Sequence, residues 1–159
     1  MPSTEAALQK VLHFDSPRDN YRCDAAVVWC FDDRFELALK KLLKRSRIEH
    51  PDRIRVAGGA KCLASPDRDF EREFVLDQLQ KSVRLHGTER TILMVHTDCG
   101  AYGGLAAFDG DSRAESSHHM GELRRAANCI LERFPAMRVD AYFIDFEGIW
   151  QAEELAAAV

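Results

Sequence analysis

Hydrophobic positions along the chain alternate between two periods, one typical of buried strands and the other typical of amphipathic helices. Residues 24–31 form a short, nearly continuous apolar run, which predicts a strand buried on both faces. Residues 53–57 alternate like a strand, and residues 91–96 and 139–146 are apolar again. We therefore expect four strands. The last is apolar enough to need a cover, which a partner chain would supply if this strand lies at an edge.

Helical spacing of apolar residues fills the intervals between these strands. The Ser-Pro-Asp sequence at residue 65 is typical of a helix start, because it offers a hydroxyl cap, a proline in the first turn and an early acid. In that helix we expect Phe70, Phe74, Leu79 and Val83 to be buried. We expect helices over residues 33–46, 65–85, 117–134 and 153–158, and a polar, glycine-rich loop over 100–116.

Strands that alternate with helices predict an α/β fold with right-handed crossovers. We expect three layers, with a central, mostly parallel sheet of four to five strands flanked by helices. The chain has 159 residues, of which 46% are hydrophobic and 30% charged, and it has no internal repeat or linker. This composition is typical of a globular protein, and the length favours a single domain over residues 1–159.

Composition also excludes several classes of function. The net charge of −4 gives no indication of a nucleic-acid partner. No apolar run approaches the roughly 18 residues that a membrane span needs, and the N-terminal residues do not form a signal peptide. We therefore expect a cytoplasmic protein without a membrane partner. Five cysteines in such a chain favour metal binding or catalysis over a set of disulfides.

Three metal-competent side chains follow two of the predicted strands. Cys30 ends the first strand, His96 ends the third, and Cys99 lies three residues further on. Ligands gather at the carboxyl ends of strands in parallel sheets, and zinc favours thiolate and imidazole ligands. These residues would fill three of four tetrahedral positions on Zn²⁺ and leave one for water or substrate. The alternative is that they only pack in the core, since a free cysteine often behaves as a small apolar side chain.

Two further residues make the pattern more specific. Asp32 and Arg34 complete a C-x-D-x-R motif with Cys30, and residues 96–100 read H-T-D-C-G. Together these motifs resemble the β-class carbonic anhydrases, whose signature is C-x-D-x-R followed by H-x-x-C-G. The segment Arg55-Val-Ala-Gly-Gly is also similar to the family's R-N-A-G segment, with valine in place of asparagine. The resemblance spans about residues 25–104 and suggests a compact, divergent member of that family.

The resemblance implies an activity and a set of roles. Cys30, His96 and Cys99 would be the zinc ligands, and Asp32 and Arg34 a dyad that orients a zinc-bound hydroxide. The reaction would be the reversible hydration of carbon dioxide to bicarbonate, in a homodimer or higher homo-oligomer. In some members the aspartate itself moves onto the zinc. Three glycines are candidate pocket or backbone positions: Gly58, Gly59 and Gly100.

Several alternatives stay open at this point. A related branch of the fold hydrolyses carbonyl sulfide or carbon disulfide with the same ligands, and a homologue that binds zinc without turnover is also possible. A thiol redox protein is disfavoured because the chain has no C-x-x-C motif. His118 and His119 are candidate proton shuttles, although an exposed pair on a helix surface is the favoured interpretation.

Overall fold

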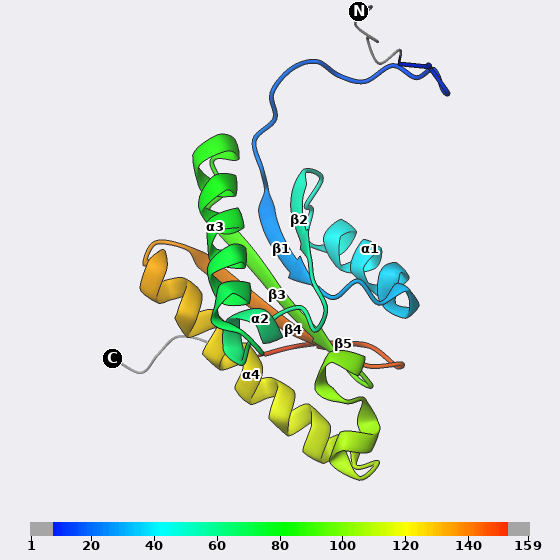
Figure 1. Cartoon of the computed structure of the whole chain (residues 1–159), viewed down its shortest axis with the longest axis vertical. Coiled ribbons are helices and arrows are strands. Elements are labelled where there is room, and N and C mark those ends of the chain that lie inside the picture. The colour runs from blue at the N-terminus through cyan, green and yellow to red at the C-terminus, as the bar shows by residue number, and fades with distance from the viewer. Residues whose placement is uncertain (1–7, 153–159) are drawn as a thin grey trace, which may run out of the picture.

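The computed structural model describes residues 8–152, whose core is a five-stranded sheet (Figure 1). The strand order is β2-β1-β3-β4-β5. The first four strands run parallel, and β5 runs antiparallel to β4. The predicted α/β class and mostly parallel sheet are therefore confirmed. The strands are β1 (Ala25–Trp29), β2 (Pro51–Arg55), β3 (Arg90–His96), β4 (Arg138–Ile144) and β5 (Ile149–Gln151).

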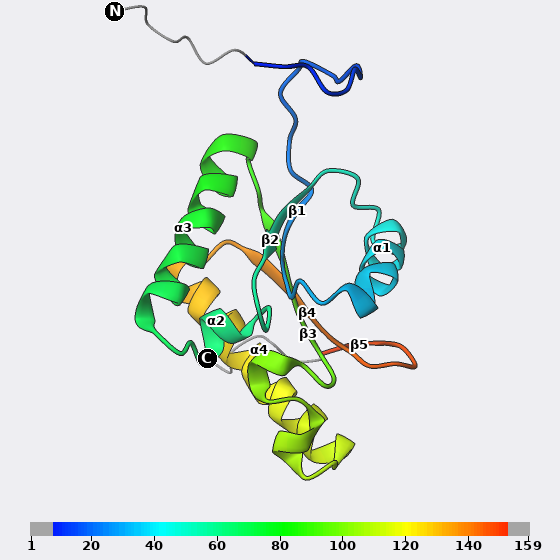
Figure 2. The same cartoon turned by 45° about the vertical axis from the view of Figure 1, so that its right-hand side comes forward.

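Helices cover both faces of the sheet and complete the three predicted layers. One helix, α1, lies on one face, while α2, α3 and α4 lie on the other (Figure 2). Short 3-10 turns η1, η2 and η3 connect some of these elements. The helices are α1 (Glu36–Arg45), α2 (Lys61–Ala64), α3 (Asp69–His86) and α4 (Ser112–Arg133), and the turns are η1 (Asp33–Phe35), η2 (Gly100–Tyr102) and η3 (Leu105–Phe108).

The strand β1 is buried on both faces, as the apolar run at residues 24–31 predicts. Val27 and Trp29 of β1 belong to the apolar cluster under α1. Their neighbours Ala26 and Val28 belong to the cluster under α2, α3 and α4. Every residue of β1 is fully buried. Burial of a side chain such as Val28 contributes roughly 1.5–3 kcal/mol, so this strand is strongly fixed in place.

The second predicted helix differs from the structure at its start and on its buried face. It begins at Asp69 rather than at Ser65, because residues 61–64 form the separate helix α2. Phe70 and Phe74 are 61% and 54% exposed, so their predicted burial is wrong. The buried stripe of α3 instead consists of Val75, Leu76, Leu79 and Ser82.

The predicted loop over residues 100–116 contains more structure than expected. It holds the turns η2 and η3, and α4 begins at Ser112 rather than near residue 117. The Asp111 carboxylate accepts hydrogen bonds from the backbone N–H groups of Arg113 and Ala114, which is the expected chemistry of a helix N-cap. The earlier start adds a first turn, and that turn brings Glu115 into the protein interior.

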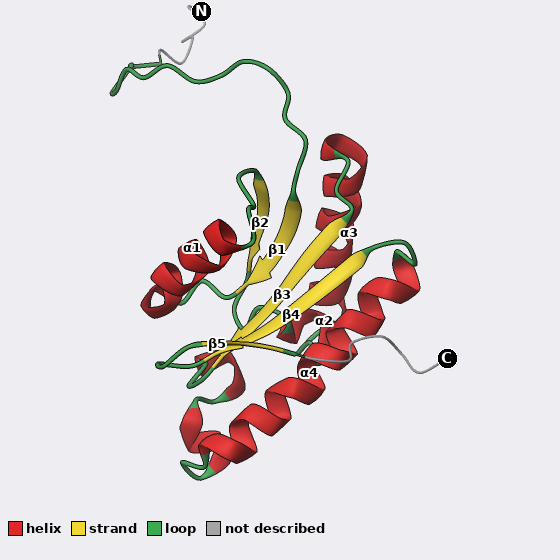
Figure 3. Ribbon diagram, turned by 180° about the vertical axis from the view of Figure 1, so that it is seen from behind, coloured by secondary structure: helices red, strands yellow, loops and turns green. Residues whose placement is uncertain are grey.

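The last predicted strand is not an edge strand. A tight turn, in which the Asp145 carboxylate accepts hydrogen bonds from the backbone N–H groups of Glu147 and Gly148, returns the chain as β5 beside β4 (Figure 3). This chain itself therefore supplies the cover expected from a partner chain along Tyr142–Ile144. The helix predicted over 153–158 lies outside the described residues. Within residues 8–152, no helix is long and apolar enough to cross a membrane.

Gly59 allows the segment after β2 to pack directly against the ends of two other strands. Its φ is +55°, and a Cβ at this position would lie 2.3 Å from the Met94 carbonyl oxygen and 3.1 Å from the Cys30 backbone nitrogen. The next residue, Ala60, donates a backbone hydrogen bond to the same Met94 oxygen at 3.2 Å. No other residue type fits here without moving the backbone.

Gly59→Ala is therefore expected to lower the free energy of unfolding by roughly 3 kcal/mol or more, because backbone strain and a steric clash act together. Gly110→Ala is the matched control, since Gly110 has φ +75° but nothing lies within 4 Å of the added Cβ. Backbone strain alone costs about 1–2 kcal/mol there. Chemical denaturation measures both variants. Equal losses would contradict the close packing at Gly59.

Candidate metal centre

Three buried side chains meet at the carboxyl ends of β1 and β3. Cys30 follows β1 directly, His96 is the last residue of β3, and Cys99 lies in the loop after it. Because β1 and β3 are parallel neighbours, their ends lie at the same edge of the sheet. One ligand atom from each of the three residues lies within 4.8 Å of the other two. The structure thus brings Cys30, from the end of the first strand, together with His96 and Cys99, from the end of the third.

The ring nitrogens of His96 have different surroundings. Nδ1 lies 2.8 Å from the Thr97 carbonyl oxygen, an acceptor that requires this nitrogen to carry a proton. In the neutral ring that a metal binds, this leaves Nε2 as the available nitrogen, and here Nε2 is buried without a hydrogen-bond partner. A buried polar atom without a partner is costly unless something binds it. A metal ion fits this position, since a neighbouring carbonyl commonly fixes the tautomer of a ligating histidine.

The two thiols also suit a cation. Interaction with the Cys99 thiol lowers the pKa of Cys30 to about 4, and the same interaction raises the pKa of Cys99. One sulfur is thus a thiolate that the proton of the other stabilises. A divalent metal would take the place of that proton, because thiolates are the metal-binding form of cysteine. The donor set of two sulfurs and one imidazole nitrogen matches zinc chemistry.

Asp32 and Arg34 form an ion pair at the edge of this cluster. Arg34 Nη2 lies 2.7 Å from Asp32 Oδ2, and Arg34 Nε lies 3.1 Å from both carboxylate oxygens. The Asp32 carboxylate also accepts the Arg34 backbone N–H at 3.0 Å and so caps the turn η1. These hydrogen bonds lower the pKa of Asp32 to about 2, and the carboxylate is ionised at neutral pH.

The ion pair lies close to the unpartnered histidine nitrogen. Asp32 Oδ2 is 3.9 Å from His96 Nε2, and the same oxygen accepts the short hydrogen bond from Arg34. In this structure the carboxylate is therefore held by the guanidinium while it stays near the metal cluster. The sequence leaves open whether Asp32 rests on the metal or on Arg34, and in this structure it pairs with Arg34.

Arg34 has a second anchor that sequence reasoning did not assign to it. Its Nη1 lies 3.0 Å from Asp98 Oδ2, and its Nη2 donates to the Asp98 carbonyl oxygen at 3.0 Å. The other Asp98 oxygen, Oδ1, accepts the backbone N–H of Leu105. Asp98 thus joins the arginine to the loop that carries His96 and Cys99. Its place inside the H-T-D-C-G motif is the signal that could have indicated this contact.

A cavity of about 380 Å³ opens at the cluster. Gly58 and Gly100 line it, whereas Gly59 lies behind it against the strand ends. Two of the three predicted pocket glycines therefore lie in the wall of the cavity, and the third does not. The lining residues are Cys30, Phe31, Asp32, Ala57, Gly58, Cys99, Gly100 and Ala101.

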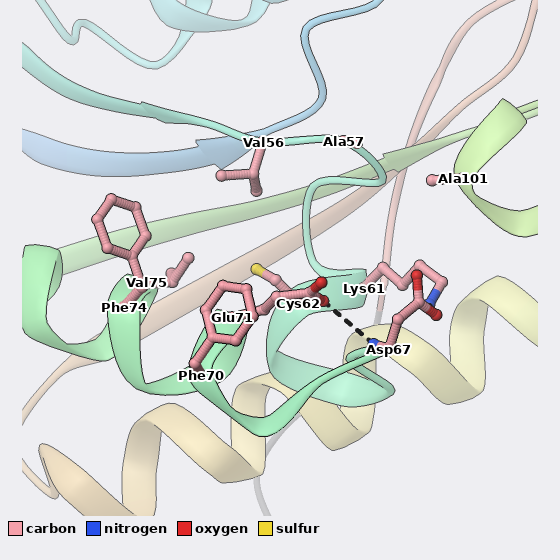
Figure 4. Close-up of a pocket in the computed structure, with 10 residues that line it drawn as sticks. All are labelled: Val56, Ala57, Lys61, Cys62, Asp67, Phe70, Glu71, Phe74, Val75 and Ala101. Carbon is pink, nitrogen blue, oxygen red and sulfur yellow. Dashed lines mark hydrogen bonds and ion pairs between the residues drawn. The ribbon is translucent and has the colours of Figure 1, made fainter.

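A second cavity of about 250 Å³ shares Ala57 and Ala101 with the first (Figure 4). Figure 4 shows Phe70 and Phe74 from α3 at one side of it and Lys61 at the other. This cavity accounts for the exposure of the two phenylalanines, which the helical pattern places in the core. Periodicity alone does not distinguish an apolar side chain in a cavity wall from one in a core.

The histidine pair on α4 does not form an exposed surface. His118 is exposed, but His119 is fully buried, so the favoured interpretation is wrong for one of the two residues. His119 packs against the rings of Tyr102 and Phe143, with centroids 4.6 Å and 5.6 Å away, and neither ring nitrogen has a hydrogen-bond partner. Burial, followed by the charges of His118 and His96, lowers the pKa of His119 to about 4.

The fold and the cluster together define a class of protein. A mostly parallel sheet that carries a buried Cys/His/Cys cluster at its strand ends is the arrangement that the resemblance to the β-carbonic anhydrases implies. Solved structures agree in fold. The β-carbonic anhydrase isoform I of Trichomonas vaginalis superposes with a TM-score of 0.56 at 13% identity, covering 88% of this chain and 87% of that one. A β-carbonic anhydrase from Sordaria macrospora gives 0.59 at 10% identity, covering 84% and 82%.

Sequence comparison identifies the family. Residues 21–155 match the family model described as "Putative carbonic anhydrase". The chain belongs to this family, and the predicted resemblance is confirmed. Two uncharacterised proteins are also similar. The one from Rickettsia bellii is 25% identical and the one from Rickettsia conorii 23% identical, each over 126 residues. These matches cover 77% of this chain in both cases, with 77% of the R. bellii protein and 68% of the R. conorii protein.

The lowered pKa of His119 predicts a loss of stability in acid. Between pH 6.5 and about 4 the unfolded chain binds a proton on this ring that the folded chain does not bind, so stability falls as the pH falls. The expected loss of unfolding free energy from this ring reaches about 3 kcal/mol near pH 4. In chelator-treated protein, His119→Leu should flatten the dependence of unfolding free energy on pH by about one proton. His118→Gln removes only one of the charges that lower this pKa, so it should flatten the dependence less. Parallel curves for wild type and His119→Leu would contradict the prediction.

Proposed function

We propose that this protein catalyses the reversible hydration of carbon dioxide to bicarbonate with a zinc ion held by Cys30, His96 and Cys99. The observation that carries the proposal is the coincidence of two features at one edge of the sheet. A buried Cys/His/Cys cluster has an unpartnered histidine nitrogen, and an ionised Asp–Arg pair lies 3.9 Å from that nitrogen. Family membership and the similarity of fold support the same activity.

The three ligand residues would hold the metal in a dry site. All three are at most 4% exposed, so bulk water does not compete strongly for their positions. Three protein ligands leave a fourth tetrahedral position, which is the arrangement of catalytic rather than structural zinc sites. When bound, zinc would supply Lewis acidity that lowers the pKa of a coordinated water to about 7.

Asp32 would orient the reacting water, and Arg34 would keep Asp32 in place. A carboxylate with a pKa of about 2 accepts hydrogen bonds at every physiological pH. Arg34 engages both oxygens of Asp32, so the carboxylate is held beside the metal position instead of turning to solvent. The cavity beside Asp32 is walled by Ala57, Ala101 and Phe31, whose apolar side chains suit a small, uncharged substrate.

The wild-type protein is expected to bind about one zinc per chain and to hydrate carbon dioxide in a stopped-flow assay. Asp32→Asn should keep the zinc but lower kcat/KM by roughly 10²-fold or more, because an amide oxygen and nitrogen do not replace an ionised acceptor. Asp33→Asn is the matched control: Asp33 is the adjacent acid, and it is exposed. Cys30→Ala should lose both the metal and the activity.

Three results would contradict this assignment. Stoichiometric zinc without measurable hydration would exclude carbon dioxide as the substrate. Sulfide release from carbonyl sulfide or carbon disulfide by that same zinc protein would then assign the site to the alternative hydrolysis. Equal hydration rates for Asp32→Asn and wild type would exclude the role of the carboxylate.

We also propose that the chain forms a homo-oligomer. Residues 8–20 lead away from the body of the protein, and Tyr21 and Arg22 then contact it before β1 (Figure 1). Four apolar side chains in this segment are 71–100% exposed, which is unfavourable in an isolated chain. The β-carbonic anhydrases of Sordaria macrospora are described as tetrameric, which supports the same arrangement. The four exposed residues are Leu8, Val11, Leu12 and Phe14.

Replacement of Leu12 and Phe14 by serine is therefore expected to lower the oligomer mass measured by light scattering at a given concentration. The reason is the loss of apolar area that a partner would cover. Leu37→Ser is a suitable control, because Leu37 is 62% exposed on α1 of the folded body. A wild-type chain that is monomeric at micromolar concentration would exclude the proposal, as would an unchanged mass in the double variant.

A further inference from the structure

Glu115 is a buried carboxylate that none of the roles above uses. It lies in the first turn of α4 and is 1% exposed. Its Oε2 accepts a hydrogen bond from the Thr97 hydroxyl, and its Oε1 accepts the backbone N–H of Asp98 at 2.6 Å. Thr97 and Asp98 are the two residues between His96 and Cys99. One carboxylate therefore binds both residues that separate two candidate metal ligands.

The first of these contacts bears on His96. The Thr97 carbonyl oxygen is the partner of His96 Nδ1, and Nε2, which has no hydrogen-bond partner, is the nitrogen left for a metal ion. Glu115 holds Thr97 from the side-chain end, so the carbonyl of Thr97 keeps its direction toward the ring. Outer contacts of this kind fix the orientation of a ligating histidine.

The second contact bears on Cys99. Asp98 has φ +52°, a left-handed conformation that is costly for any residue with a side chain. This turn directs the chain from the end of β3 back toward the cluster, where Cys99 comes within 4.8 Å of Cys30 and His96. The hydrogen bond from the Asp98 N–H to Glu115 holds the strained residue in this conformation.

The position of Glu115 on its helix explains why a carboxylate is retained in the interior. Asp111 caps the helix, and Glu115 lies in its first turn, where the helix dipole favours negative charge. Both carboxylate oxygens have donors, as a buried charge requires. His119 Nε2 is 3.9 Å from Glu115 Oε1, which is too far for a hydrogen bond, so the loop residues are the carboxylate's hydrogen-bond partners.

We propose that Glu115 is a positioning residue for the metal centre. Through Thr97 and Asp98 it fixes the spacing and direction of His96 and Cys99, so that both face Cys30 before the metal binds. The proposal rests on the proposed zinc site, but it does not depend on which substrate the site uses.

Zinc affinity, measured by competition with a chromogenic chelator, tests the proposal. Glu115→Gln should weaken zinc binding by about 10–100-fold, because an amide has one acceptor oxygen for two donors and turns its NH₂ group toward one of them. The Co²⁺ form of this variant should show altered d–d and thiolate charge-transfer bands.

Asp140→Asn is the matched control. Asp140 is also a buried carboxylate, but it binds Arg90. It belongs to the third residue pair from the start of the β3–β4 register, away from the edge that carries His96. This variant is expected to lower Tm while zinc affinity stays within about twofold of wild type.

A second pair of variants keeps the test sound if Glu115→Gln does not fold. Thr97→Val removes the hydroxyl donor and should weaken zinc binding. Thr97→Ser keeps the hydroxyl and should bind zinc like wild type. Where the double variant folds, its loss should be smaller than the product of the single losses, because both changes break one network.

The outcomes separate this proposal from the proposed function. Zinc binding by Glu115→Gln and Thr97→Val that equals wild type would overturn the positioning role alone. A loss of affinity in Asp140→Asn equal to that in Glu115→Gln would also overturn it, since general destabilisation would then account for both. Zinc-loaded wild type that hydrates no carbon dioxide would overturn the proposed reaction and leave the positioning role standing. A wild-type chain that binds no zinc would overturn both.

Discussion

The parallel pairing of β1 with β3 is the constraint on which the rest of the site depends. Ala26, Val27 and Val28 pair with Thr91, Ile92 and Leu93, and this register brings the residues after each strand to one edge. Both strands are buried on both faces, so a slip in register would have to move apolar side chains on two sides at once. The position of Cys30 relative to His96 is therefore fixed by the core, and the loops only refine it.

The loops around the cluster restrain one another through polar contacts. Arg34 joins the turn after β1 to the loop after β3, because it binds both Asp32 and Asp98. Glu115 approaches the second loop from α4, and the segment at Gly59 packs on the strand ends from β2. Each contact comes from a different element of the fold. The cluster is thus held by the sheet, by one helix and by a loop from a third strand.

The sequence predicts the sheet and the proximity of Cys30, His96 and Cys99 well, because both depend on local patterns. Apolar runs mark β1 and β3, and the two motifs place Cys30, His96, Asp32 and Arg34 at the strand ends. What it predicts poorly depends on tertiary contacts. Burial of Glu115 and His119 follows from an earlier start of α4 and from packing against the sheet, and neither leaves a signal in periodicity. Phe70 and Phe74 line a cavity, and β5 is only three residues long, so its pattern is too short to read.

The location of the candidate cluster at two neighbouring strand ends has a consequence for how such sequences diverge. Residues 30–34 and 96–100 carry the ligands and the dyad, whereas the strands behind them need only apolar side chains of suitable volume. The cluster therefore constrains two short stretches directly, and it constrains the rest of the chain through a few contacts such as those of Gly59 and Glu115. A fold with so few direct constraints is compatible with very different sequences, as the TM-scores of 0.56 and 0.59 at 13% and 10% identity illustrate.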